Sequence, residues 1–122
     1  MSSWRNTWRE CATLTDQPVL TFMTKHPKKL LVVITEAMLE KQLVLDLKRL
    51  GAHGYTVHEV RGGSAHATHD GSWVADRMIE LKIICDEPVA DAIAEWVIAH
   101  YAAHYGVSLY FADVGVVRPQ KF

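Results

Sequence analysis

The segment from residue 28 to residue 63 reads KKLLVVITEAMLEKQLVLDLKRLGAHGYTVHEVRGG and sets out the first half of the fold. Its unbroken apolar run at positions 30–34 is typical of a strand that is buried on both faces. Thr35 and Glu36 follow and predict a helix N-cap and an acid in the first turn. The predicted helix carries leucines at helical spacing, at positions 39, 43, 47 and 50. Gly51 stands where a C-cap glycine ends a helix, and the alternating residues 54–60 predict a second strand.

The second half of the chain repeats this order after a long connection. Residues 61–76 are rich in glycine and small polar side chains, and long loops in compact domains are usually functional or disordered. Residues 78–85 predict a third strand, whose apolar face consists of Ile79, Leu81, Ile83 and Cys85. A second helix is expected to begin near Asp86, with Pro88 in its first turn, and to end at Gly106. Residues 107–117 predict the last strand. The expected apolar stripe of the second helix is Val89, Ile93, Trp96, Val97 and His100.

The predicted order is β-α-β-loop-β-α-β, which defines the α+β ferredoxin-like, or split βαβ, arrangement. In this arrangement both helices cover one face of the sheet, and nothing else in the chain covers the other face. The segment 30–33 and the last strand are nevertheless apolar on both sides. A second copy of the same sheet is the simplest cover, so the pattern predicts a homo-oligomer.

Length and charge exclude several classes of protein. A chain of 122 residues fits one domain, and we expect an N-terminal extension at 1–27 followed by a domain at 28–122. The net charge of −1 shows no basic excess of the kind that nucleic-acid binders carry. No apolar run is long enough to span a membrane, and the N-terminus lacks the apolar core of a secretion signal. We therefore expect a cytoplasmic protein that is neither exported nor membrane-spanning.

Four segments resemble the PII superfamily of signalling proteins when they are taken in order. They are KLLVVITE at 29–36, GAHGYTV at 51–57, VRGGS at 60–64, and YGVSLYF at 105–111 with the residues 114–118. The resemblance covers about residues 28–122 and is best to the PII-like branch linked to inorganic-carbon uptake, namely SbtB and the carboxysome-associated CPII proteins. It implies a ferredoxin-like homotrimer in which residues 61–76 form the T-loop, a segment that changes shape to engage partners.

The resemblance also implies a ligand site in the clefts between subunits. Such proteins bind adenine nucleotides there, so ADP or ATP is the expected ligand. By position, Thr56 matches a residue that contacts adenine, and the glycines of the T-loop start let the backbone approach the nucleotide. Arginine suits phosphate oxygens because its guanidinium donates paired hydrogen bonds. The nucleotide contacts implied in this way are Thr56, Arg61, Gly62, Gly63, Ser64 and Arg118.

The carbon-linked branch is further expected to sense bicarbonate. The donors that would hold bicarbonate here are Arg61, Ala65 and Arg118. The implied partner is a bicarbonate transporter or a carboxysome component. The chain departs from PII proteins proper in two ways. A glycine-rich, lysine-containing phosphate loop is replaced by the two acids Asp86 and Glu87, and the long loop lacks the tyrosine that some PII proteins use for uridylylation.

Histidines raise the question of metal binding or catalysis. His66, His69 and Asp70 fall in the loop, and His100 and His104 share one helical face. Neither set has the third fixed ligand of a typical metal site, so no metal is expected. His100 and His104 are instead expected to stack with the tyrosines at positions 101 and 105.

Two alternatives to a regulatory module stay open. One is a small oligomeric enzyme with an intersubunit pocket around His58, His66 and Asp76, although no Ser/His/Asp or Cys/His motif supports catalysis. The other is a trimeric metal-binding protein of the CutA kind, which shares the fold. Trp73 in the loop is a candidate anchor for a partner or a base, and Cys85 is expected to be a small buried hydrophobe.

Overall fold

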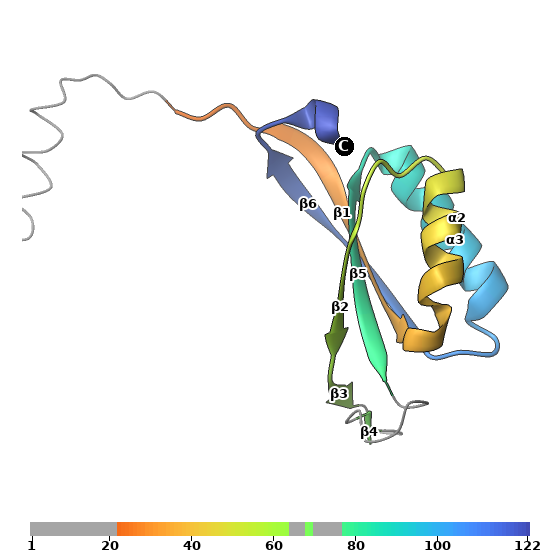
Figure 1. Ribbon diagram of the computed structural model, residues 1–122. Coiled ribbons are helices and arrows are strands. Elements are labelled where there is room, and N and C mark those ends of the chain that lie inside the picture. The colour runs from red at the N-terminus through yellow and green to blue at the C-terminus, as the bar shows by residue number, and fades with distance from the viewer. Residues whose placement is uncertain (1–21, 64–67, 70–76) are drawn as a thin grey trace, which may run out of the picture.

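The computed structural model describes residues 22–63, 68–69 and 77–122, and its main sheet is antiparallel and four-stranded, with two helices on one face (Figure 1). The four strands lie in the order β2-β5-β1-β6. Their bounds are β1 His26–Glu36, β2 Thr56–Val60, β5 Met78–Cys85 and β6 Val107–Val116. The helices are α2 Glu40–Arg49 and α3 Glu87–Tyr101, and single 3-10 turns lie at η1 Ala37–Leu39 and η3 Pro119–Lys121. This is the ferredoxin-like α+β fold that the sequence predicts.

The hydrophobic core lies between the sheet and the two helices. Alternate side chains of the two central strands form its floor, and apolar positions of α2 and α3 form its roof. Burial of each large aliphatic side chain contributes roughly 1.5–3 kcal/mol. The fully buried members include Leu31, Val33, Leu43, Leu47, Ile79, Leu81, Ile83, Ile93 and Val97. The apolar face predicted for residues 78–85 is confirmed, because Ile79, Leu81, Ile83 and Cys85 are all 1% exposed or less.

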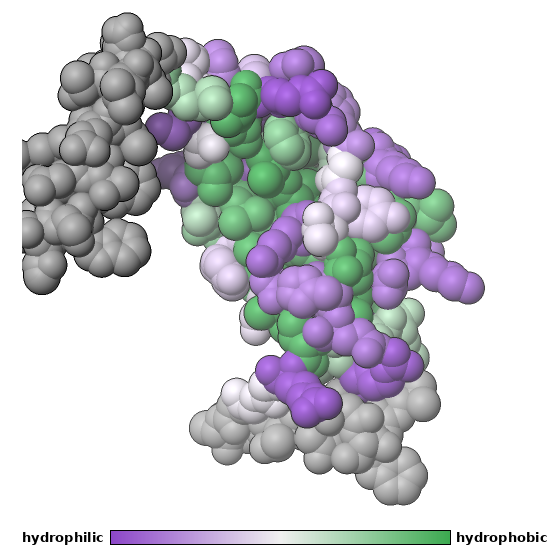
Figure 2. Space-filling view, turned by 60° about the vertical axis from the view of Figure 1, so that its left-hand side comes forward, coloured by the Kyte–Doolittle hydropathy of each residue, from purple (hydrophilic) through white to green (hydrophobic). Residues whose placement is uncertain are grey.

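In the part of the chain that the structure describes, the opposite face of the sheet carries no helix. Figure 2 brings this side forward and shows apolar surface interrupted by hydrophilic side chains. The registers place one cross-strand row at His58, Glu80, Ile34 and Ser108, and the next at Thr56, Lys82, Val32 and Tyr110. Tyr110 is 51% exposed, which is unusual for an aromatic ring in the middle of a strand.

The first helix does not begin at Thr35. That residue is fully buried in β1, and its hydroxyl donates a hydrogen bond of 2.7 Å to the Gly106 carbonyl oxygen. The chain turns through η1 before α2 begins at Glu40, and neither helical segment has a side-chain cap. A partner 71 residues away therefore overrides the local capping preference.

One predicted helix end is confirmed and the other is wrong. Gly51 has φ 107° and follows α2, with its N–H bonded to Lys48 and the Ala52 N–H bonded to Leu47, which is a Schellman ending. The second helix ends at Tyr101, five residues before Gly106. Gly106 instead directly precedes β6, and its backbone is hydrogen-bonded to the side chains of Thr35 and Glu36 at the end of β1.

Trp96 and His100 do not belong to the buried stripe of α3. That stripe consists of Ala90, Ile93 and Val97. Trp96 and His100 stack on each other, with ring centroids 3.5 Å apart, and the Arg49 guanidinium lies 3.9 Å from the Trp96 ring centroid. The pair thus joins α3 to α2 at the side of the helix layer.

The segment 61–76 contains a second, two-stranded sheet that the sequence did not predict. Its strands are β3 Gly62–Gly63 and β4 Thr68–His69, which pair Gly62 with His69 and Gly63 with Thr68. The predicted positions Ser64, Ala65, His66, Asp70, Trp73 and Asp76 lie outside the described residues. So does most of the expected extension, because the description begins at Phe22 and β1 already begins at His26.

Candidate functional site

A cavity of about 560 Å³ lies where β2 runs into β3. Its walls come from segments that are far apart in the sequence: the ends of β1 and β2, the start of β5, and the segment that leads into β6. The floor is apolar, and the charged groups in it are Arg61 and Glu80. The lining residues are Ile34, Val60, Arg61, Gly62, Gly63, Met78, Glu80, Gly106, Val107 and Ser108.

The cavity thus brings together three of the residues that the sequence predicts to contact nucleotide, namely Arg61, Gly62 and Gly63. Gly62 has no positive φ, and a Cβ placed on it would meet nothing within 4 Å among the described residues. A glycine without described neighbours is suited to the close approach of a ligand or of another segment.

The end of β1 fixes two walls of this cavity. The Glu36 carboxylate accepts a hydrogen bond of 2.7 Å from the Gly106 N–H, and the Thr35 hydroxyl donates one to the Gly106 carbonyl. On the other side, the Ala37 N–H donates a bond of 2.9 Å to the Arg77 carbonyl, just where β5 begins. Both segments are therefore tied to the same short stretch of the central strand, which holds the cavity walls in place.

An ion pair joins the two roots of the loop. Arg77, which precedes β5, pairs with Glu59 near the end of β2. Both side chains are about half exposed, so the pair contributes little stability by itself. It links the outgoing and returning strands at the end of the β2–β5 ladder, two residues before Arg61.

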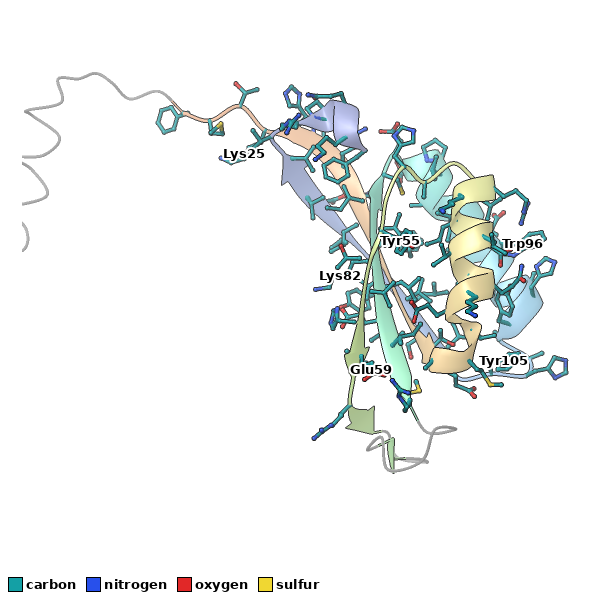
Figure 3. The ribbon with its side chains drawn as sticks, viewed as in Figure 1. Lys25, Tyr55, Glu59, Lys82, Trp96 and Tyr105 are labelled. Carbon is teal, nitrogen blue, oxygen red and sulfur yellow. The ribbon has the colours of Figure 1, made fainter. Side chains whose placement is uncertain are left out.

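Thr56 and Arg118, the other predicted contacts that the structure describes, do not line this cavity. Thr56 is exposed on β2 directly opposite Lys82, on the uncovered face of the sheet. Figure 3 shows Lys82 pointing away from the helices on that side. Thr56 therefore shares its surface with a lysine that the sequence analysis did not single out.

Arg118 and Arg61 lie at opposite ends of the sheet. Arg61 follows Val60, which lies level with the end of β1, whereas Arg118 comes two residues after Val116, which pairs with the start of β1. Along β1 this amounts to about 30 Å at roughly 3.3 Å per residue. The two guanidinium groups of one chain are too far apart to contact the same phosphate group.

The link between β5 and α3 borders a second, smaller hollow of about 280 Å³. Its charges are already paired, since Lys28 Nζ lies 2.7 Å from Asp86 and Lys29 contacts Asp113. The hydrogen bond to Asp113 raises the pKa of Lys29 above its ordinary value. Both lysines that line this hollow thus have an acidic partner.

The remaining candidate positions have structural surroundings. Cys85 is 1% exposed, as expected, and burial raises the pKa of its thiol. His100 stacks on Trp96, at an interplanar angle of 21°, and lies tilted beside Tyr101 at 6.5 Å between ring centroids. His104 is exposed at the turn after α3. In the part of the chain that the structure describes, no three His, Cys, Asp or Glu side chains gather as a metal site would require.

Two lining elements were missed by the sequence analysis: Glu80, and the segment Gly106 to Ser108. Glu80 alternates with the core residues of β5, so periodicity places it on the uncovered face but does not single it out. Gly106 was interpreted as a helix stop. No local pattern reports that these segments meet beside Arg61.

Among the helices that the structure describes, none is long and apolar enough to cross a membrane.

The fold and the glycine-rich cavity at the root of a long loop agree with the family comparison. The model of the family "nitrogen regulatory protein P-II" matches residues 28–121. The chain therefore belongs to the P-II family, whose members are signalling proteins and are typically trimers. A comparison with curated protein sequences returns no match.

Solved structures place the chain among the PII-like members. A PII-like signalling protein of Thermus thermophilus is 38% identical, with a TM-score of 0.71 over 82% of this chain and 99% of its own. CPII of Thiomonas intermedia K12, a nitrogen regulatory PII-like protein, is 25% identical, with a TM-score of 0.74 over 83% and 98%. That CPII structure is bound to ADP, AMP and bicarbonate. The apo form of the same CPII is 23% identical, has a TM-score of 0.58 and shares the fold.

Proposed function

We propose that this protein is a PII-like regulator that binds an adenine nucleotide, ADP or ATP, together with bicarbonate in clefts between the subunits of a homotrimer. Ligand binding changes the conformation of the loop at about 61–76. Through this loop the protein controls inorganic-carbon uptake or carboxysome function, with a bicarbonate transporter or a carboxysome protein as partner.

The observation that supports the proposal best is the position of Arg61, Gly62 and Gly63. They line the 560 Å³ cavity and at the same time form the root of the long loop. A ligand anion beside Arg61 would therefore lie against the first residues of the segment that has to change shape. The CPII relative bound to ADP, AMP and bicarbonate supports the choice of ligands.

The separation of Arg61 from Arg118 supports a site shared between two subunits. Since about 30 Å of sheet lies between them in one chain, Arg61 of one subunit and Arg118 of its neighbour are proposed to hold the same ligand. Thr56 is proposed to contact the adenine, as the resemblance implies. Ser64 and Ala65 follow the cavity in the sequence and are proposed to add backbone donors to the nucleotide and to bicarbonate, respectively.

The proposed mechanism is a shift between loop conformations. A guanidinium without a counterion favours water, whereas a bound phosphate or bicarbonate favours arrangements in which Arg61 stays at the cavity. Only a difference in ligand affinity between two loop shapes can shift their populations. The partner then distinguishes the two shapes.

Isothermal titration of the purified protein with ADP, in buffers with and without bicarbonate, tests the proposal. We expect saturable ADP binding that bicarbonate alters, and native mass spectrometry should give the mass of a trimer. Arg118→Ala should weaken ADP binding, whereas the exposed α3 variant Asp91→Ala should leave it unchanged. A protein that binds neither ligand, or a monomer at micromolar concentration, contradicts the proposal.

A further inference from the structure

Glu80 is the one acidic residue that lines the cavity beside Arg61, among the residues that the structure describes. It projects from β5 on the uncovered face, and its side chain is only 15% exposed. Cavities that bind only anions do not gain from a buried carboxylate, because two negative groups repel each other strongly away from bulk water. Glu80 is therefore not suited to contact an anionic group of a ligand, and its carboxylate needs a different explanation.

The surroundings of Glu80 leave one carboxylate oxygen available. Its Oε2 lies 3.3 Å from His58 Nε2, the residue directly opposite on β2. Its Oε1 lies 3.9 Å from Lys82 Nζ, which is beyond hydrogen-bond range. On the side of β1 its neighbour is Ile34, which has no polar side-chain atom. Within the described residues, Oε1 thus has Lys82 as an ion-pair partner at 3.9 Å but no donor within hydrogen-bond distance.

The registers also fix where Glu80 lies relative to Arg61. Met78 pairs with Val60, which precedes Arg61, and Glu80 comes two residues further along β5. Arg61 therefore lies level with Arg77, and Glu80 stands three residues along the strand from that level, about 10 Å away. The cavity offers a cation at one position and an acceptor at another, above an apolar floor of Ile34, Val60 and Met78.

We infer that Glu80 is a specificity-determining residue of this site and accepts a hydrogen bond from a neutral donor group of the ligand. The inference rests on the proposed function, in which the anionic part of the ligand lies at Arg61. The complementary ligand carries an anionic group at one end and a hydroxyl or amino donor about 10 Å away, the length of three strand residues. In an adenine nucleotide, the ribose hydroxyls and the amino group of the base are such donors. Glu80 thereby orients the nucleotide and disfavours a ligand with a second anionic group at that position.

The test compares ligand analogues on the full-length protein by isothermal titration. ADP, 2′-deoxyADP, 3′-deoxyADP and inosine diphosphate are titrated into the unaltered protein and into Glu80→Met, which removes the acceptor at similar volume. Hydrogen bonds to a charged group correspond to about a tenfold or larger loss of affinity when one partner is removed. We expect Glu80→Met to weaken ADP binding about tenfold and to leave unchanged the affinity for the one analogue that lacks the donor.

Controls separate this inference from the proposed function. Glu95→Met makes the same substitution at an exposed position of α3 and should leave all affinities unchanged. If Glu80→Met fails to fold by circular dichroism, Glu80→Gln takes its place and should weaken ADP by a smaller factor with the same ranking of analogues. ADP bound by Glu80→Met with unaltered affinity, or an equal loss for ADP and all three analogues, overturns the role of Glu80. Absence of ADP binding to the unaltered protein overturns the proposed function itself.

Discussion

Mixing two variants of the chain tests whether each ligand site takes residues from two subunits. The proposed site uses Arg61 of one copy and Arg118 of the next, since about 30 Å separates these residues within one chain. Each of the variants Arg61→Ala and Arg118→Ala removes one charged donor from every site. The loss corresponds to about 1.5–3 kcal/mol, or roughly a 10- to 150-fold weaker Kd for ADP.

Trimers assembled from equal amounts of the two variants give a different result. A site is complete when the copy that retains Arg61 is followed by a copy that retains Arg118. In a ring of three head-to-tail contacts with random assembly, this occurs at about one site in four. Titration of co-expressed variants should therefore recover about a quarter of the sites at the affinity of the unaltered protein, and native mass spectrometry confirms the mixed composition.

Two results would refute this reasoning. If mixed trimers recover no high-affinity sites, both arginines act from the same chain or neither contacts the ligand. If either single variant binds ADP as tightly as the unaltered protein, that arginine is not part of the site. A mixture of the unaltered protein with itself, carried through the same procedure, is the control for assembly.

Three further predictions concern the fold that supports the site. Burial and the hydrogen bond to Asp46 raise the pKa of Tyr101 to about 12, so the folded state holds this proton more tightly than the unfolded state does. The resulting contribution to the free energy of unfolding should be fully present below pH 10 and should be lost between about pH 10 and 12. Urea unfolding should show this loss to be absent in Tyr101→Phe. Gly51→Ala should cost about 1–2 kcal/mol because φ is 107° there, whereas Gly54→Ala, where a Cβ meets nothing within 4 Å, should be neutral by thermal unfolding. In a Cys11→Ser background, the Cys85 thiol should react with a thiol reagent only after denaturation; rapid labelling of the native protein would contradict its burial.

The elements with a strict hydrophobic period were predicted from the sequence most reliably. Residues 78–85 alternate because β5 has one face in the core and one outside it, so period two reports the true environment of each side chain. The helix end at Gly51 was predicted equally well, since a Schellman ending is a local structure whose hydrogen bonds span only five residues. The uncovered second face followed from the topology alone.

The errors share a physical cause, which is a partner distant in the chain. Threonine is a favoured N-cap residue, yet the Thr35 hydroxyl donates its hydrogen bond to the Gly106 carbonyl. The local capping preference therefore did not decide where the helix begins. Trp96 and His100 occupy apolar-stripe positions on α3 but stack beside Arg49 of α2. Each interaction depends on how two helices or strands meet, which no single segment encodes.

The same reason limits what the sequence reveals of the site. Arg61, Gly62 and Gly63 are adjacent in the chain, so one resemblance finds all three. Glu80 and Ser108 reach the cavity from other strands, through registers that only the folded sheet defines. The roles of Thr56 and Arg118 stay predictions, because they concern contacts with a second subunit.

The ends of the described chain leave the sheet together, and both roots of the loop lie at the other end (Figure 1). His26 begins β1 opposite Val116, and Phe122 follows only a short turn later. A fluorophore or affinity tag joined after Phe122 is consequently held about 30 Å from Arg61 and Arg77 of its own chain. In the proposed trimer, however, Arg118 of one copy lies beside Arg61 of the next, so a tag joined after Phe122 is expected to approach the loop of the neighbouring copy instead of its own.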